Sequence, residues 1–408
     1  PLTPNGKVNR LALPPPSDEA PDALTGSVAP RNRLELQLAA IWEQVLGVAH
    51  IGVRDNFFVL GGHSLLALQI FGAIEQTLGK RLPMSLLFQA PTIELLAEVL
   101  SQEGCVVRWD SLVAIQPGGM KPPFFVVPGV GGNVLVFARL SKQLGHEQPF
   151  YGLQARGLDW EALPFTRVEE MAAHYVHEIR GIRPKGPYLI GGTCTGGVVA
   201  YEMAQQLVAQ GEQVILAIME SWHPRSHQAY RNSPPVFLWP TLHFVQKVKS
   251  YCKQLWRLPL RAWPSYWQGK LGSIKSLLKR EWLHLGSQED YTDLVTSATF
   301  YAVSRYQPQP YPGRLLNVIA SKRPLSDSTQ DTRLAWSELA LMGDQTVFMP
   351  AEDSGRLFVA PHVQELAHHL IAYFNHECPD HTRPVHLARP GNDIGVVQAN
   401  LQPRLLEE

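Results

Sequence analysis

The residues best suited to covalent chemistry surround one cysteine, Cys194, in the sequence GGTCTGG. An apolar run at residues 188–190 precedes it, and a helical stretch at residues 198–209 follows it. A side chain on a sharp strand-to-helix turn projects from the end of a sheet, and the small residues Gly192 and Gly196 let the turn tighten. The pattern predicts a cysteine nucleophile. The alternative is a buried cysteine packed as a small hydrophobe.

A glycine-rich turn, Pro128-Gly129-Val130-Gly131-Gly132, follows the apolar run FFVV. Such a turn can aim a backbone N–H at the negative charge that develops on a carbonyl oxygen during acyl transfer. The N–H groups of Val130 and Thr195 are therefore the candidate oxyanion hole. An ordinary connecting turn is the alternative, since the turn alone is a weak signal.

A second reactive residue is Ser64, which ends the sequence DNFFVLGGHS at residues 55–64. Two glycines free the backbone there, and the serine opens a predicted helix. A hydroxyl at a helix N-terminus suits an attached phosphate, because unpaired N–H groups and the helix dipole favour negative charge. The alternative is that Ser64 is only the N-cap of the helix.

The composition limits the classes of protein to which this chain could belong. It has 408 residues, 45% hydrophobic and 18% charged, with 36 Lys+Arg against 36 Asp+Glu. The length suggests two to four domains, and the neutral balance disfavours general nucleic-acid binding. The four cysteines lie far apart, so neither a zinc ribbon nor a disulfide framework is expected, and no metal site is predicted. No apolar run reaches a membrane span of about 20 residues, and we expect a cytoplasmic setting.

The pattern of elements predicts two folded units. Residues 32–103 have three helical segments, at 34–46, 64–78 and 92–100, and predict a small four-helix-type bundle. Beyond residue 120, short apolar runs alternate with helices, which predicts a mostly parallel α/β sheet. Its predicted strands lie in the short apolar runs at 123–132, 188–192, 214–220 and 315–321. Expected flanking segments are a proline-rich linker at 11–31, a second linker at 104–121 and a tail at 379–408.

The first unit resembles the peptidyl carrier protein of nonribosomal peptide synthetases, through the motif D-x-F-F-x-x-G-G-x-S at residues 55–64. The resemblance covers residues 32–103 and implies that Ser64 carries a covalent 4′-phosphopantetheine. It also implies two partners, a phosphopantetheinyl transferase and upstream synthetase modules. Residues 1–10, PLTPNGKVNR, resemble the end of an adenylation domain, whose lysine would be Lys7.

Residues 122–378 resemble the type I thioesterase of the same synthetases, through PPFFVVPGVGGN, YLIGGTCTGG and YPGRLLNVIAS. The resemblance implies an α/β-hydrolase domain with a helical lid, here about residues 222–290. It implies a peptide thioester substrate, delivered by the chain's own carrier. The family's acid follows the strand after the nucleophile helix, which places it at Glu220, where the family usually has aspartate. A solvated charge at a strand end is the alternative reading of Glu220.

The sequence departs from the thioesterase pattern at the general base. The family's histidine loop reads PAEDSGR here, at residues 350–356, and contains no histidine. His223 is the candidate base, because it lies three residues after Glu220 where the chain leaves the sheet; a surface loop histidine is the alternative. His227 and His243 are the next candidates, whereas His362, at a helix start, is expected to be structural. Two other interpretations stay open: the helix N-terminus alone ionises the cysteine, or catalysis has been lost.

The product is suggested by the cysteine and by the lid. With a cysteine at this turn, the sequence resembles those thioesterases that close four-membered rings. One group of them forms β-lactones, and another forms the monobactam β-lactam. Residues 247–280 hold nine Lys/Arg and no Asp/Glu, which suits an anionic substrate, the pantetheine phosphate or the acidic carrier unit. A solvated helix face explains the same residues. Hydrolytic or macrocyclising release, and a non-catalytic docking module, are the alternative functions.

Overall fold

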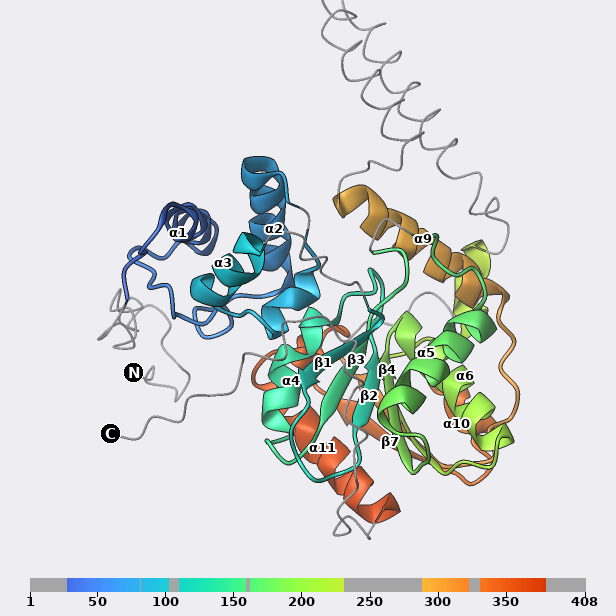
Figure 1. The fold of residues 1–408 in the computed structure, drawn as a ribbon. Helices are drawn as coiled ribbons and strands as arrows, with labels where there is room; N and C mark the ends of the chain where they lie inside the picture. The colour runs from blue at the N-terminus through green and yellow to red at the C-terminus, as the bar shows by residue number, and fades with distance from the viewer. Residues whose placement is uncertain are drawn as a thin grey trace, which may run out of the picture.

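The computed structural model describes residues 28–80, 82–102, 110–158, 162–230, 288–322 and 331–378. They form a helical N-terminal bundle, residues 28–102, and a sheet domain, residues 110–378, which lie side by side (Figure 1). The predictions for residues 1–10, most of the 11–31 linker, most of the lid, including the basic stretch, and the tail fall outside the described residues. None of the helices in the described ranges is long and apolar enough to cross a membrane.

The N-terminal bundle contains the three predicted helices and one short 3₁₀ helix. In chain order they are α1 (Arg33–Leu46), α2 (Ser64–Leu78), η3 (Met84–Phe88) and α3 (Ile93–Ser101). The Thr92 hydroxyl accepts a hydrogen bond from Leu95 N–H at 3.3 Å and so caps the N-terminus of α3. Trp42 and Phe57 are fully buried and meet edge to face, with ring centroids 5.6 Å apart. The predicted four-helix-type bundle is confirmed.

The sheet domain contains a seven-stranded sheet with the strand order β1-β3-β2-β4-β5-β6-β7. All neighbouring strands are parallel except β1 and β3, which are antiparallel. The predicted parallel α/β sheet is confirmed, and the four predicted strands are β2, β4, β5 and β6. The strands are β1 (Leu112–Gln116), β2 (Phe124–Val127), β3 (Phe150–Leu153), β4 (Tyr188–Thr193), β5 (Val214–Met219), β6 (Leu315–Ala320) and β7 (Asp344–Met349).

One predicted boundary is wrong, because the linker expected at residues 104–121 contains strand β1. Leu112 pairs with Leu153 and Ala114 with Tyr151, so this segment is the edge of the sheet. Only Val113 of β1 is buried. An edge strand with one buried side chain gives a weak alternation, which explains why the sequence pattern did not reveal it.

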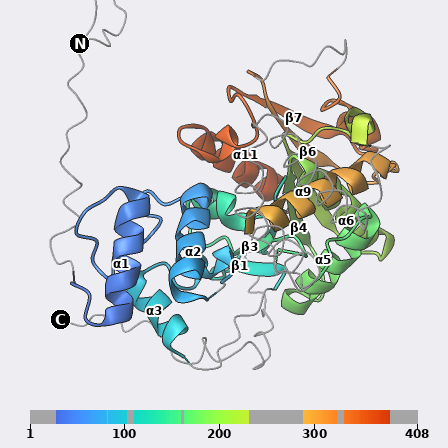
Figure 2. The same ribbon diagram turned by 90° about the horizontal axis from the view of Figure 1, so that it is seen from above.

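Helices cover both faces of the sheet and make it a three-layer domain (Figure 2). Helices α5, α6 and α10 pack against one face in a core that includes Tyr188, Tyr201 and Trp336. Helices α4 and α11 pack against the other face, around Phe124, Phe150 and other buried side chains. The helices and 3₁₀ turns are η4 (Val134–Phe137), α4 (Ala138–Gln143), α5 (Val168–Ile182), α6 (Thr195–Ala209), η5 (Pro224–Tyr230), α9 (Gln288–Arg305), α10 (Ala335–Leu339), η8 (Arg356–Phe358) and α11 (His362–Glu377).

The bundle contacts the sheet domain beside the glycine-rich turn. Leu135 of η4 packs into the hydrophobic core of the bundle. Asn133, which precedes η4, donates a hydrogen bond from its amide to the Met84 sulfur at 3.6 Å. The two units therefore share apolar packing next to the turn that carries Val130.

Candidate functional site

Cys194 stands on a tight turn between β4 and α6, as the sequence predicts. Its backbone has φ 51° and ψ −125°, an unfavourable conformation for a residue with a Cβ. A Cβ on Gly192 would lie 2.3 Å from Gly196 O, and one on Gly196 would lie 2.2 Å from Pro128 O. Both positions therefore require glycine. The half-buried thiol sits at the N-terminus of a 15-residue helix, where unpaired helix N–H groups and the helix dipole favour negative charge.

The glycine-rich turn borders the cysteine. A Cβ built on Gly129 would lie 2.9 Å from the Cys194 Cβ, so this part of the turn passes directly beside the reactive side chain. Val130 is the next residue and is 44% exposed, while Thr195 is the first residue of α6. The first N–H groups of a helix have no acceptor within the helix. Both candidate oxyanion donors thus come from segments that adjoin Cys194.

Glu220 lies at the end of β5, in the strand next to the cysteine. Cys194 N–H donates to Met219 O at 3.1 Å, which fixes the two strand ends side by side. The Glu220 side chain is fully buried, so the alternative of a solvated charge is wrong. Its Oε2 accepts a hydrogen bond from Ala320 N–H at 2.6 Å, and its Oε1 pairs with Arg333 Nη1 at 2.8 Å.

Arg333 forms a buried ion pair with Glu220, the acid that the thioesterase resemblance places at this site. The guanidinium carbon of Arg333 lies 5.0 Å from the centre of the Trp222 ring, and the residue is 2% exposed. Its Nη2 also pairs with Asp331 Oδ2 at 2.6 Å. Burial raises the pKa of Asp331, but the hydrogen bonds from Arg333 outweigh this and lower it overall. A buried cation between two carboxylates ties the loop after β5 to the segment before α10.

His223 is buried in the loop after β5. It is 4% exposed, and its ring centroid lies 5.3 Å from that of Trp336, so the alternative of a surface histidine is wrong. Burial, and then the positive charge of Arg225, lower the pKa of His223 to about 4. The ring is therefore neutral at pH 7. Its Nδ1 accepts a hydrogen bond from Arg225 N–H at 3.2 Å, which assigns the proton to Nε2.

The loop that bears His223 packs against the start of the nucleophile helix. A Cβ on Gly197 would lie 2.5 Å from Ser221 Cβ, which brings this loop beside α6. Of the other histidines considered, His227 has its pKa lowered by burial and meets Phe300, whereas His243 lies outside the described residues. His362 opens α11, as expected.

Ser64 is the first residue of α2, and the N-cap is His63, whose side chain makes no capping hydrogen bond. The alternative that Ser64 is merely the N-cap is therefore wrong. Gly62 N–H donates to Phe57 O at 2.8 Å, and a Cβ on Gly62 would lie 2.5 Å from the Phe57 ring. The motif thus folds a tight loop onto a buried phenylalanine and delivers Ser64 to a helix N-terminus. Its unpaired N–H groups fit a phosphodiester on the Ser64 hydroxyl.

Sequence reasoning missed Arg333. It belongs to a polar segment without helical or alternating periodicity, so neither its burial nor its partner could be read from the pattern. The one usable signal was the pair Asp331 and Arg333, two residues apart, after a predicted strand. Such a pair does not identify the third partner, because Glu220 is over a hundred residues away.

We expect Arg333→Met to destabilise the protein by about 3–5 kcal/mol, because it leaves the Glu220 carboxylate buried without its cation. Denaturant unfolding of the full chain measures this loss. Arg314→Met is the matched control, since Arg314 pairs with Glu377 at 3.2 Å but is 51% exposed, and we expect it to cost no more than about 1 kcal/mol. Equal costs for the two variants would contradict the importance of the buried pair.

Comparison with known families assigns both units. Residues 37–100 match the phosphopantetheine attachment site family, and residues 122–248 match the thioesterase domain family. The chain joins a carrier domain to a thioesterase domain. From here the N-terminal bundle is called the carrier domain and the sheet domain the thioesterase domain. The thioesterase domain is an enzyme, and the carrier domain carries covalent 4′-phosphopantetheine.

Two curated proteins show the similarity over about half of this chain. The chain is 43% identical over 235 residues to the dimodular nonribosomal peptide synthase of Bacillus subtilis (strain 168), covering 57% of this chain and 10% of that protein. It is 42% identical over 216 residues to the indigoidine synthase of Dickeya dadantii (strain 3937), covering 52% and 14%. The chain thus spans about a tenth of the length of these relatives.

A solved structure resembles both domains together. It is a holo four-domain nonribosomal peptide synthetase bound to AMP and glycine, 25% identical in sequence, with a TM-score of 0.52. The match covers 92% of this chain and 28% of that one. The carrier and thioesterase domains described here therefore have the fold of part of that synthetase.

Proposed function

We propose that this chain releases a carrier-bound peptide by transferring it to Cys194 and then closing it into a small ring. The observation that carries the proposal is Cys194 on the strained turn at the N-terminus of α6. A cysteine nucleophile leaves the acyl group as a thioester, which stays activated. An amine attacks a thioester more readily than water does, and the strained ring that we propose is a β-lactam.

Ser64 would hold the phosphopantetheine arm, which would supply the peptide as a thioester. The Cys194 thiolate attacks its carbonyl carbon, and the N–H groups of Val130 and Thr195 bind the oxygen as it becomes negative. The bond to the carrier thiol breaks as the tetrahedral centre collapses, and the acyl group remains on Cys194. The carrier thiol leaves with a proton.

His223 is our proposed base for the Cys194 proton. In the tautomer assigned above, Nδ1 is its basic nitrogen. When Nδ1 takes up the proton, it can no longer accept the 3.2 Å hydrogen bond from Arg225 N–H, which is lost. Glu220 then acts together with Arg333: the buried pair fixes the end of β5 and the loop that carries His223. This differs from a triad in which the acid binds the imidazole alone.

In the second step, an amide or amine nitrogen of the same peptide attacks the acyl carbon. A carbon–nitrogen bond forms, the carbon–sulfur bond to Cys194 breaks, and the nitrogen loses a proton to the base. The Cys194 thiolate is regenerated. Water in place of the nitrogen would give the open acid, so exclusion of water from the site decides the product.

Cys194→Ser tests the ring-closing role. A serine oxoester is a poorer acyl donor to nitrogen, so we expect a lower ratio of cyclic to hydrolysed product than in the wild type. Product mass spectrometry measures the ratio, because the cyclic product lacks the one water that the acid contains. An unchanged ratio would contradict the role of the thioester, and a wild-type ratio already dominated by acid would identify a hydrolase.

A further inference from the structure

The loop after β5, which carries the proposed base, is held at both ends by residues 331–336. At its start, Arg333 Nη1 donates to Glu220 Oε1 at 2.8 Å. At its far end, the Ser226 and Thr332 hydroxyls share a hydrogen bond. Glu220 and Arg333 are 113 residues apart in the chain, so these tertiary contacts fix the loop to the segment that leads into α10.

The start of this loop has a conformation that needs such support. Glu220 has φ 46°, in the left-handed region that a residue with a Cβ rarely adopts. A strained residue of this kind persists only where its surroundings hold it. Ser221 and His223, which follow it, are also buried. The position of the imidazole therefore depends on contacts from outside the loop.

Trp336 contacts the middle of the loop, where the imidazole lies, and is fully buried. Its indole N–H donates to Ser221 O at 2.9 Å, which fixes the backbone two residues before His223. Its ring centroid lies 5.3 Å from that of the His223 ring, with the two planes at 51°. One side chain thus holds both the backbone and the ring of the proposed base.

Trp336 also contacts the nucleophile helix. Its ring centroid lies 4.8 Å from that of Tyr201, which is fully buried as well. Tyr201 lies on α6, about two helical turns after Cys194. Its hydroxyl donates to Gln309 O at 2.7 Å, so this ring is held at its far end too. Trp336 therefore packs between the loop that carries His223 and the helix that starts at Cys194.

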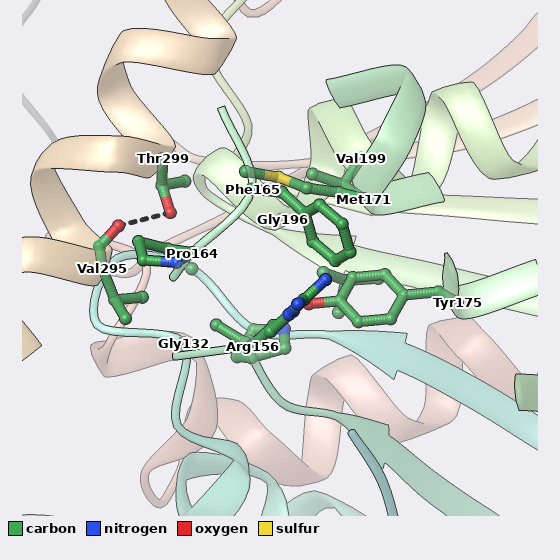
Figure 3. A pocket seen from close by; sticks show the side chains of 14 residues that line it. Gly132, Arg156, Pro164, Phe165, Met171, Tyr175, Gly196, Val199, Val295 and Thr299 are labelled. Atoms are coloured by element: carbon green, nitrogen blue, oxygen red, sulfur yellow. Dashed lines mark hydrogen bonds between the residues drawn. The ribbon is translucent and has the colours of Figure 1, made fainter. Parts of the chain in front are cut away.

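The side of α6 away from Tyr201 is closely packed. Val199, two residues before Tyr201, points to roughly the opposite side of the helix. Together with Gly196 it lines a cavity of only about 30 Å³ beside the turn (Figure 3). Such a cavity has room for about one water molecule. The helix has little space to shift there, so it gives Trp336 a fixed surface to pack on.

We propose that Trp336 is a positioning residue for acyl transfer to Cys194, because its N–H and its ring together set the place and the plane of the His223 imidazole. The proposal rests on the proposed function, since it takes His223 as the base for Cys194. The indole N–H is a hydrogen-bond donor only, so Trp336 acts through His223 and not as a base itself. A tryptophan that only filled the core would stabilise the fold without a particular effect on this base.

We expect Trp336→Phe to slow single-turnover acylation of Cys194 from the loaded carrier by on the order of 10- to 100-fold, because a displaced catalytic group loses its geometry. Phenylalanine keeps a ring in the core but removes the donor to Ser221 O. In the His223→Ala background the same substitution should cause no further loss, since the imidazole that Trp336 positions is already absent. The same fold-loss in both backgrounds would overturn the proposal, because it would show an effect independent of His223.

A second variant makes the test independent of a single substitution. Trp336→Tyr has a ring and a hydroxyl donor, so it should recover part of the rate that Trp336→Phe loses. The comparison with the His223→Ala background is made for both variants, with circular dichroism as the folding control, and a folded variant decides it. A Trp336→Tyr rate no higher than that of Trp336→Phe would contradict the role of the N–H donor.

Tyr311→Phe is the matched control and should acylate Cys194 at the wild-type rate. Tyr311 is fully buried in the same core, with its ring centroid 5.8 Å from that of Tyr201. Its hydroxyl donates to Val214 O at 3.3 Å, at the opposite end of β5 from the loop. The variant therefore removes one hydrogen bond to a backbone carbonyl, as Trp336→Phe does, but away from His223.

The single variants separate failure of this inference from failure of the proposed function. If His223→Ala acylates Cys194 at the wild-type rate, it is the proposed base that fails. If His223→Ala is slow while a folded Trp336→Phe acylates at the wild-type rate, the positioning role alone is overturned.

Discussion

Cys194→Ala is expected to stop product release while the loaded carrier domain persists. Without a nucleophile, only water can cleave the thioester on the carrier arm. We expect a loss on the order of 10⁶-fold, the size of effect that nucleophile removal has in serine hydrolases. Product appearance after loading, followed by mass spectrometry, measures the rate.

The alanine variant is a clean test because the turn does not depend on the thiol. Its shape comes from Gly192 and Gly196, whose Cβ positions are filled by backbone atoms of Gly196 and Pro128. Alanine keeps the Cβ of residue 194 and thus the same backbone strain. Cys378 is the other described cysteine that forms no disulfide, and Cys378→Ala is the control that should release product at the wild-type rate. Release by Cys194→Ala at the wild-type rate would contradict the nucleophile.

His223→Ala should slow acylation of Cys194 by roughly 10²- to 10⁴-fold, the usual contribution of a general base. Single-turnover transfer from the loaded carrier measures it, with circular dichroism as the folding control, because the ring packs on Trp336. His362→Ala is the matched control and should change the rate little, since His362 only opens α11. Equal rates in the wild type and His223→Ala would contradict His223 as the base. The remaining explanation would be a cysteine ionised by the helix N-terminus alone.

The pH dependence of the same step follows from the burial of His223. A general base works when its ring is neutral, and the pKa of His223 is lowered to about 4. The wild-type rate should therefore hold as the pH falls past 6.5, the ordinary value of histidine, and drop only as it passes through about 4. In His223→Ala this acid limb should disappear. An acid limb near 6.5 in the wild type would point to a different, solvated histidine.

Much of the fold was predictable because it rests on local patterns. The helix at residues 64–78 begins and ends where its periodicity does, strand β5 is an unbroken apolar run, and β4 begins with the apolar residues 188–190. Strand β1 was not predictable, because its own residues alternate only weakly between apolar and polar. It becomes a strand through its backbone pairing with β3, which lies about forty residues later in the sequence. Strand β7, in which only Met349 is buried, is similar.

The site divides in the same way between local and distant causes. Cys194 could be found from sequence, since the glycines that shape its turn lie within two residues of it. The partner of Glu220 could not, because the Arg333 cation comes from a segment after β6.

The account depends most on a covalent acyl group at Cys194. The direct measurement loads the Ser64 arm with a peptide thioester, quenches the full chain in acid during turnover, and maps the acyl mass by peptide mass spectrometry. We predict the acyl mass on the peptide that contains Cys194 in the wild type and its absence in Cys194→Ala. Ser64→Ala, which cannot be loaded, should show neither carrier-bound nor Cys194-bound acyl. Product release with the acyl group found only on the Ser64 arm would contradict the account.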